Sequence, residues 1–137
     1  MDADCRNEII ELHRFFEEWM TGIGGDFSRF ATVMAEDFEI VFPDGNRMSQ
    51  PELLIWMRGL EGTLTEQEFE IRIENLEERT PAPGMFIVTY EEWQTRDGET
   101  NARRSTALFR ENPELPNRVE WVHVHETWLP EKSESAP

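Results

Sequence analysis

Two carboxylates and a guanidinium occur in three runs of alternating polar and apolar residues, where they could support acid–base chemistry. The residues are Glu92, Arg103 and Glu126. Because side chains two positions apart share one face of a β-strand, Tyr90 lies beside Glu92 and Ser105 lies beside Arg103. In a partly dry cleft such a carboxylate can act as a general acid or base with a pKa set by burial. The same residues could instead form a purely structural cross-strand salt-bridge network.

The pairing of the first two strands follows from a hairpin signal. Asp97-Gly98 is a strong signal for a two-residue turn. Counting outward from this turn places Glu92 opposite Arg103. By the same count, Tyr90 stands opposite Ser105.

The pairing of the last two strands is set across the loop formed by residues 112–117. We pair Glu111 with Arg118, which places Arg103 beside Glu126. The resulting face is apolar at one end and polar at the other, as in a ligand cavity with a few convergent polar groups. Its predicted members are Val88, Tyr90, Glu92, Gln94, Arg103, Ser105, Ala107, Phe109, Val122, Val124, Glu126 and Trp128. If this register were wrong by one residue, the side chains of the opposite face would line the cavity instead.

The opposite face of these strands is too apolar and aromatic for water, which indicates an interface between two copies of the chain. His123 and His125 on this face could also be two metal ligands, since alternate residues point the same way. The remaining histidine, His13, lies on a predicted helix, so the pattern offers no full ligand set. We therefore expect a homodimer through this face, and neither a metal nor a cofactor. The predicted outer residues are Trp93, Leu108, Trp121, His123 and His125.

Helices precede the strands that carry these residues. Apolar residues at helical spacing predict an amphipathic helix over residues 4–21 and a shorter helix that begins at Asp26 and includes Val33 and Met34. A strand over residues 38–42 leads through a Pro-Asp-Gly-Asn turn to a short return segment. The sequence Ser-Gln-Pro-Glu at residues 49–52 is a capping box that opens a third helix. We expect the walls of the cavity to include Phe16, Trp19, Phe42 and Trp56.

Four alternating runs follow the third helix and predict long strands that begin near residues 69, 85, 102 and 119. Their connections are too short for crossovers, so the strands must be antiparallel. The run 119–129 is partly apolar on both faces, which indicates a central strand. Helices followed by a curved, mainly antiparallel sheet predict an α+β fold in which the helices cover one face.

Length and composition limit the class of protein. The chain has 137 residues and a formal net charge of −16, which disfavours binding to nucleic acids and to anionic membranes. We expect one domain over residues 1–130 and a disordered tail over residues 131–137. Cys5 is the only cysteine, and no apolar run is long enough for a membrane span. We therefore expect a soluble, cytoplasmic protein.

The order of the predicted elements resembles the nuclear-transport-factor-2-like superfamily, which has a cystatin-like cone fold. The resemblance spans residues 5–129 and includes Trp121, His123, His125 and Thr127 near the end of the last strand. It is closest to the SnoaL-like and kinase-association-domain-like branches. The resemblance implies a conical pocket between the helices and the sheet, a dimer through the outer side of the sheet, and Glu126 facing the pocket.

The superfamily contains isomerases, dehydratases, cyclases, hydrolases and non-catalytic binding modules, so the resemblance alone fixes no activity. The chain departs from the ketosteroid-isomerase branch because Phe42 or Pro43 stands where that branch carries a catalytic aspartate. One hypothesis is an enzyme of the SnoaL type that binds a small, partly apolar molecule. The alternative is a non-catalytic ligand-sensing or assembly module. In the first hypothesis Glu92, Glu126 and Tyr90 are catalytic, and the ligand contacts Arg103, Ser105, Phe16, Trp19, Phe42, Trp56, Val124 and Trp128.

Overall fold

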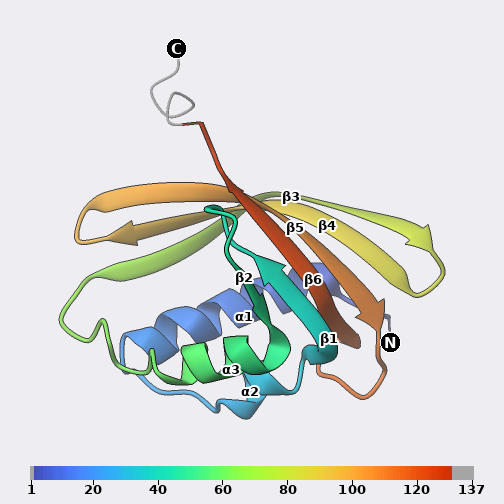
Figure 1. The fold of residues 1–137 in the computed structure, drawn as a ribbon, viewed down its shortest axis with the longest axis horizontal. Helices are drawn as coiled ribbons and strands as arrows, with labels where there is room; N and C mark the ends of the chain where they lie inside the picture. The colour runs from blue at the N-terminus through green and yellow to red at the C-terminus, as the bar shows by residue number, and fades with distance from the viewer. Residues whose placement is uncertain (1, 131–137) are drawn as a thin grey trace.

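A computed structural model describes residues 2–130, in which three helices lie beneath a curved six-stranded sheet (Figure 1). In chain order the elements are α1 (Cys5–Met20), α2 (Ser28–Ala31), β1 (Met34–Val41), β2 (Arg47–Ser49), α3 (Gln50–Arg58), β3 (Phe69–Ala82), β4 (Met85–Arg96), β5 (Glu99–Glu111) and β6 (Val119–Trp128). This arrangement confirms the predicted α+β fold of the cystatin-like cone type. The predicted disordered tail, residues 131–137, lies outside the described residues.

The sheet has the strand order β2-β1-β6-β5-β4-β3. Strands β3 to β6 form an antiparallel meander, as predicted, whereas β1 runs parallel to β6. The last strand therefore lies between β1 and β5, which confirms its predicted central place. Helices α1 and α3 lie on the concave side of the sheet (Figure 1).

The predicted capping box is present at the start of α3. The Ser49 hydroxyl accepts a hydrogen bond from the backbone N–H of Glu52, and the Glu52 side chain accepts one from the backbone N–H of Ser49. These reciprocal bonds satisfy two N–H groups that the helix leaves without partners. The third helix therefore starts where the sequence predicts.

Helix α2 is shorter than predicted. Asp26 is not its N-cap, because its carboxylate instead accepts hydrogen bonds from the backbone and hydroxyl of Ser28 in a local turn. Val33 and Met34 do not continue the helix. The carbonyl of Val33 accepts a hydrogen bond of 2.8 Å from the backbone N–H of Trp121, so β1 begins beside β6 at this point. Tertiary pairing with the central strand thus overrides the local helical pattern.

The predicted hairpin register is correct for β4 and β5 but wrong for β5 and β6. Glu92 pairs with Arg103, as expected. Glu111, however, pairs with Val119 rather than with Arg118. Arg118 has a positive φ of 63°, and its carbonyl accepts a hydrogen bond from Asn112 N–H within the connecting loop, so it does not belong to the strand.

Two changes follow from this register. Arg103 stands opposite Trp128 rather than beside Glu126, and Ser105 stands opposite Glu126. The residues of β6 that were predicted to face the cavity at this end still do so, because the shift is by two positions.

A β-bulge changes which side chains of β6 face inward. Leu108 pairs with His123, whereas the next residue, Phe109, pairs with Trp121, so Val122 is the extra residue of β6. Trp121 therefore lies in the core at 2% exposure, with its ring 4.5 Å from that of Phe109. The prediction that Trp121 belongs to the outer face and Val122 to the inner face is wrong.

A buried carboxylate at the start of α1 joins several elements, and we call its surroundings the Glu8 cluster (Glu8, Arg29, Asn117 and Trp121). Glu8 is 0% exposed. One of its oxygens accepts hydrogen bonds from Arg29 Nη2 at 2.8 Å and from Asn117 Nδ2 at 2.9 Å. The other accepts bonds from Trp121 Nε1 at 2.9 Å and from Arg29 Nη1 at 3.2 Å. The cluster thus fixes α1 to α2, to the β5–β6 loop and to β6.

Candidate functional site

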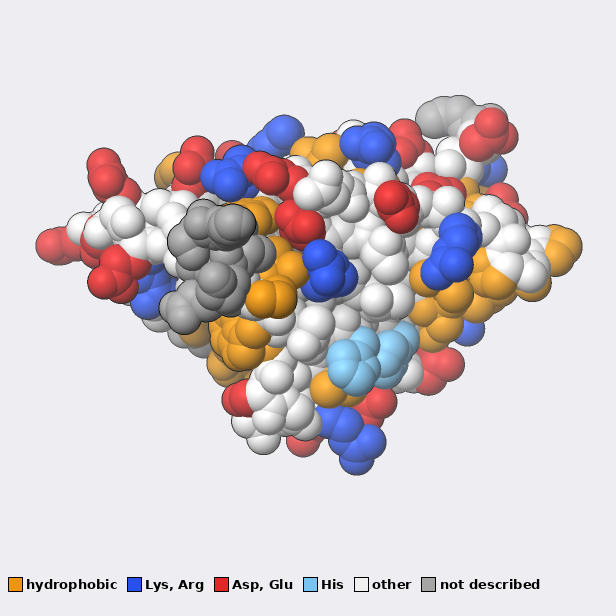
Figure 2. Space-filling model, turned by 90° about the horizontal axis from the view of Figure 1, so that it is seen from above, with side chains coloured by type: hydrophobic (Ala, Val, Ile, Leu, Met, Phe, Trp, Pro, Cys, Tyr) orange, Lys and Arg blue, Asp and Glu red, His pale blue; other side chains and the backbone are white. Residues whose placement is uncertain are grey.

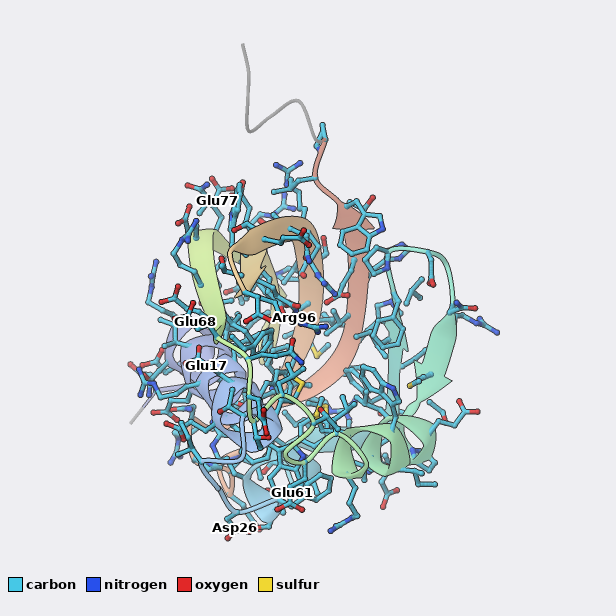
Figure 3. All side chains as sticks on the ribbon, turned by 90° about the vertical axis from the view of Figure 1, so that its left-hand side faces the viewer. Glu17, Asp26, Glu61, Glu68, Glu77 and Arg96 are labelled. Atoms are coloured by element: carbon cyan, nitrogen blue, oxygen red, sulfur yellow. The ribbon has the colours of Figure 1, made fainter. Side chains whose placement is uncertain are left out.

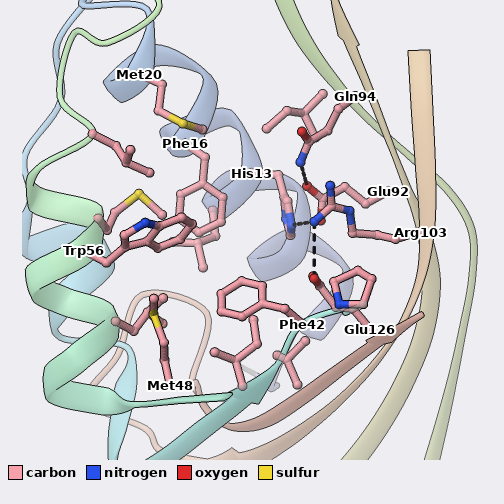
Figure 4. Close-up of a pocket in the computed structure, with 18 of the residues that line it drawn as sticks. His13, Phe16, Met20, Phe42, Met48, Trp56, Glu92, Gln94, Arg103 and Glu126 are labelled. Atoms are coloured by element: carbon pink, nitrogen blue, oxygen red, sulfur yellow. Dashed lines mark hydrogen bonds and ion pairs between the residues drawn. The ribbon is translucent and has the colours of Figure 1, made fainter. Parts of the chain in front are cut away.

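A cavity of about 550 Å³ lies between the helices and the concave face of the sheet. All three helices, all six strands and several of the loops that join them contribute to its lining. The volume is within the range of pockets that hold small organic molecules. Figure 4 shows its two contrasting sides.

One side of the cavity is apolar. Phe16 and Met20 extend from α1, Phe42 follows β1, Met48 lies on β2 and Trp56 lies on α3 (Figure 4). The rings of Phe42 and Trp56 pack edge to face with their centroids 5.6 Å apart. A ligand that contacts this side would bury its apolar surface against aromatic rings and thioethers.

The opposite side, which we call the polar wall, consists of His13, Glu92, Arg103 and Glu126 (Figure 4). His13 Nε2 lies 3.1 Å from Glu92 Oε1, and Arg103 Nη1 lies 3.3 Å from Glu126 Oε1. Gln94 donates a 2.7 Å hydrogen bond to the second oxygen of Glu92. All four members of the wall are largely buried, so their charges act on one another in a poorly hydrated environment.

His13 is a member of the site that the sequence analysis did not identify. Its Nδ1 lies 2.8 Å from the carbonyl oxygen of Ile9, which can only accept, so Nδ1 carries a proton. Its Nε2 faces the carboxylate of Glu92. Burial disfavours the charged ring, but the charge of Glu92 and its hydrogen bond outweigh burial and raise the pKa of His13. A signal existed in the sequence, since His13 interrupts the apolar stripe of the helix between Leu12 and Phe16.

The two carboxylates of the polar wall have pKa values that lie far apart. Burial alone would raise the pKa of Glu92, yet the charges of His13 and Arg103 lower it from 4.5 to about 2. Burial, followed by the negative charge of Glu92, raises the pKa of Glu126 to about 7, and the contact with Arg103 offsets only part of this effect. Near neutral pH, Glu92 therefore stays ionised while Glu126 can take up or release a proton.

Tyr90 also lines the cavity and is 2% exposed. Burial, together with the charges of Glu92 and Glu126, raises the pKa of its phenol well above 10. The side chain therefore keeps its proton and can act as a hydrogen-bond donor.

Most residues predicted for the site line this cavity: Phe16, Phe42, Trp56, Tyr90, Glu92, Arg103, Val124, Glu126 and Trp128. Trp19 does not line it, because its indole N–H donates a 2.8 Å hydrogen bond to the carbonyl of Met57 and its ring stacks on Phe15. Ser105 is fully buried and does not line it either. Trp128 is half exposed, and the guanidinium of Arg103 lies 4.9 Å from its ring centroid.

The convex face of the sheet carries the two adjacent histidines of the predicted outer face (Figure 2). The ring centroids of His123 and His125 are 6.4 Å apart, and His123 Nδ1 lies 4.0 Å from the carboxylate of Glu39. Within residues 2–130, no group of three or more His, Cys, Asp or Glu side chains is placed to hold a metal ion. None of the helices in this part of the chain is long and apolar enough to span a bilayer.

Comparison with known protein families gives a match that covers most of the chain. A family model described as "Sucrose-6-phosphate phosphohydrolase C-terminal" matches residues 5–130. Among curated proteins, sucrose-phosphatase 2 of Nicotiana tabacum is 22% identical over 93% of the chain, and the probable sucrose-phosphatase 3a of Arabidopsis thaliana is 21% identical over 93%. The matches cover 33% and 31% of those proteins, so the chain spans about a third of their length.

Solved structures establish the kinship of the fold. An NTF-2 like protein of unknown function from Pseudomonas aeruginosa superposes with a TM-score of 0.81 at 24% identity, covering 91% of this chain and 98% of that one. The CaMKII hub of S. rosetta superposes with a TM-score of 0.69 at 12% identity, covering 94% and 100%. These likenesses confirm the predicted resemblance to the nuclear-transport-factor-2-like superfamily, whose structures related to this chain include proteins of unknown function.

Proposed function

The chain belongs to the family described as sucrose-6-phosphate phosphohydrolase C-terminal, and from this premise we propose that its cavity binds a small, partly apolar organic molecule and acts on it by carboxylate acid–base chemistry. The family name does not by itself assign an activity to a chain that spans a third of its curated relatives. The names of those relatives make sucrose and its phosphate ester the first molecules to test as ligands.

The observation that carries the proposal is the placement of two buried carboxylates, each beside a different cation, at one end of an apolar cavity. Glu92, with a pKa of about 2, supplies a fixed negative charge, whereas Glu126, with a pKa of about 7, can exchange a proton at neutral pH. Such paired but unequal acids are typical of general acid–base sites. In this proposal Glu126 transfers the proton, Tyr90 donates a hydrogen bond to the ligand and Arg103 orients Glu126.

Native mass spectrometry of freshly purified protein tests ligand binding, with the denatured mass as reference. We expect an adduct of roughly the size of a drug-like ligand, which the Met48→Trp variant loses because the larger side chain fills the cavity. Ile55→Trp is the matched control, since Ile55 is 76% exposed and does not line the cavity. Once a substrate is identified, Glu126→Gln should abolish turnover; unchanged turnover would contradict the acid–base role.

A second candidate function is a non-catalytic sensing or assembly module that forms a homodimer through the convex face of the sheet. It is favoured by the half-buried Trp93, Leu108 and His123 on that face. Light scattering after gel filtration would detect the dimer, and Leu108→Glu should yield monomers while Ile55→Glu on the helical side should not. We also propose that residues 1–130 fold as one domain and that the protein is cytoplasmic, consistent with a single, buried cysteine.

A further inference from the structure

We propose that the cavity accepts an uncharged, oxygen-bearing ligand and rejects anions such as carboxylates and phosphate esters, because the buried cations of its polar wall already face carboxylates. The inference rests on the proposed binding of a small molecule and narrows the class of that molecule. It assigns a hydroxyl or carbonyl oxygen of the ligand to Glu126 and its apolar body to the opposite side of the cavity.

Each buried cation faces a carboxylate. His13 is 3.1 Å from Glu92, and its other ring nitrogen is bound to a backbone carbonyl. Arg103 Nη1 is 3.3 Å from Glu126, and the guanidinium also contacts Asn101 and the ring of Trp128, whereas its Nε–H is buried without a hydrogen-bond partner among the described residues. An anionic ligand would have to displace a protein carboxylate from its partner and leave that carboxylate buried without a counter-charge, which is costly.

The remaining lining cation, Arg96, cannot replace them. It is exposed, and its guanidinium lies 5.9 Å from the ring centroid of Phe69. Solvent screens such a charge. Figure 3 shows that Glu17, Glu61 and Glu68 lie on the same side of the molecule as Arg96, so carboxylates accompany this exposed cation.

Glu126 is the group that an incoming ligand would meet in the polar wall. Its second oxygen is not engaged by Arg103, whose bond goes to Oε1. Since burial and the charge of Glu92 already hold its pKa near 7, a neighbouring anion would force Glu126 to bind a proton or would place two like charges side by side. A hydroxyl group can donate to the ionised carboxylate or accept from the protonated one, so it fits both states. An ammonium group at the second oxygen of Glu126 would place two cations on one carboxylate, beside the guanidinium of Arg103.

Three probes with the same apolar body test the inference: cyclohexylmethanol, cyclohexanecarboxylate and cyclohexylmethylammonium. Binding can be measured at pH 7 by the fluorescence of Trp56, Trp121 and Trp128, which line the cavity, and by two-dimensional NMR. We expect the alcohol to bind at least ~10-fold more tightly than either charged probe, because each charged probe leaves a buried charge uncompensated.

Two variants make the test independent of the absolute affinity. Glu126→Gln removes the partner of Arg103 and should let the carboxylate probe bind at least ~10-fold more tightly than it binds the unsubstituted protein. In the double variant Glu126→Gln/Arg103→Met this gain should disappear, because the released guanidinium is absent. Circular dichroism would confirm that each variant is folded, and the comparison of the three probes on the unsubstituted protein decides the question if a variant is not.

Opposite results would overturn the inference. Tightest binding of the carboxylate or the ammonium probe to the unsubstituted protein would refute the proposed ligand class while leaving small-molecule binding intact. A Glu126→Gln variant that is folded yet gains no affinity for the carboxylate would refute the pairing argument. Failure of all three probes and of sucrose to bind, together with native mass spectra free of adducts, would remove the proposed function as well.

Discussion

Glu8 and Glu126 are both glutamates buried by α1 and the sheet, yet their surroundings differ. Glu8 is 0% exposed and accepts four hydrogen bonds from Arg29, Asn117 and Trp121. Glu126 is 7% exposed and has a single bond of 3.3 Å from Arg103, with a second carboxylate close enough to help raise its pKa to about 7. The first carboxylate is fully compensated, whereas the second is not.

The comparison distinguishes a carboxylate that is buried to hold the fold together from one that is buried where a ligand can contact it. A fully hydrogen-bonded charge adds cohesion to the core and has no capacity left for a ligand. An incompletely compensated charge that lines a cavity lowers stability and keeps hydrogen-bonding capacity for another molecule. Substitutions in the Glu8 cluster should therefore lower the free energy of unfolding, whereas a substitution at Glu126 should change how that free energy depends on pH. Three measurements test this difference.

The largest effect is expected from Glu8→Ala. The substitution leaves the buried N–H of Trp121 without its acceptor and removes the buried carboxylate that pairs with Arg29, which keeps only its 3.2 Å contact with Glu11, so the free energy of unfolding should fall by about 3–5 kcal/mol. Urea denaturation monitored by circular dichroism would measure the loss. Arg14→Ala, at an exposed position of the same helix, is the control and should change the value by less than about 0.5 kcal/mol. If Glu8→Ala lowered the free energy of unfolding as little as Arg14→Ala does, the proposed difference between Glu8 and Glu126 would be contradicted.

The second prediction concerns the pH dependence of stability. The pKa of Glu126 is raised from 4.5 to about 7 on folding, so the folded protein retains a proton that the unfolded chain releases. Between about pH 4 and pH 8 the free energy of unfolding should consequently fall as pH rises, by about 3 kcal/mol if no other group titrates.

Glu126→Gln should flatten this part of the curve, whereas Met20→Leu, a cavity substitution without a titrating group, should not. Two neighbours contribute at the edges of this window. Glu92 loses its stabilising charge as pH falls from 4.5 toward 2, and the stabilising proton of His13 is lost as pH rises from 6.5 through its raised pKa. Denaturation curves at several pH values would reveal the slope, and an equal slope in the Gln variant would contradict the assignment.

The smallest of the three effects is expected from Trp121→Phe. Phenylalanine keeps most of the ring but removes the N–H that donates to Glu8, so the free energy of unfolding should fall by about 2 kcal/mol. Trp128→Phe is the matched control on the same strand. Trp128 is 50% exposed and lies beside Arg103, so its substitution should cost less than about 1 kcal/mol. Equal losses at both tryptophans would argue against the Glu8 cluster as the more cohesive region.

Local signals in the sequence predicted the elements whose causes are local. The capping box at Ser49 and the Asp97-Gly98 hairpin are each set by a few neighbouring residues, and the structure contains both. The hairpin was sufficient to place Glu92 opposite Arg103. Most of the site residues chosen from helix face and strand alternation also line the cavity.

Features that depend on distant contacts were missed. The positive φ of Arg118 and the extra residue at Val122 arise from how the β5–β6 loop and β6 meet their neighbours, and no short motif encodes them. His13 could be placed against Glu92 only after the helix and the sheet were docked, because 79 positions separate the two residues. Register over long loops and contacts between layers are therefore where sequence reasoning failed.

The bulge at Val122 gives β6 two independent sets of inward residues. Before it, Val119 and Trp121 point inward, and after it Val124 and Glu126 point inward, so odd and even positions exchange roles within one strand. Substitutions on one side of the bulge therefore leave the side-chain parity of the other side unchanged. For protein engineering, the inward residues after Val122 can be varied to reshape the cavity while the pairing of the residues before it is kept.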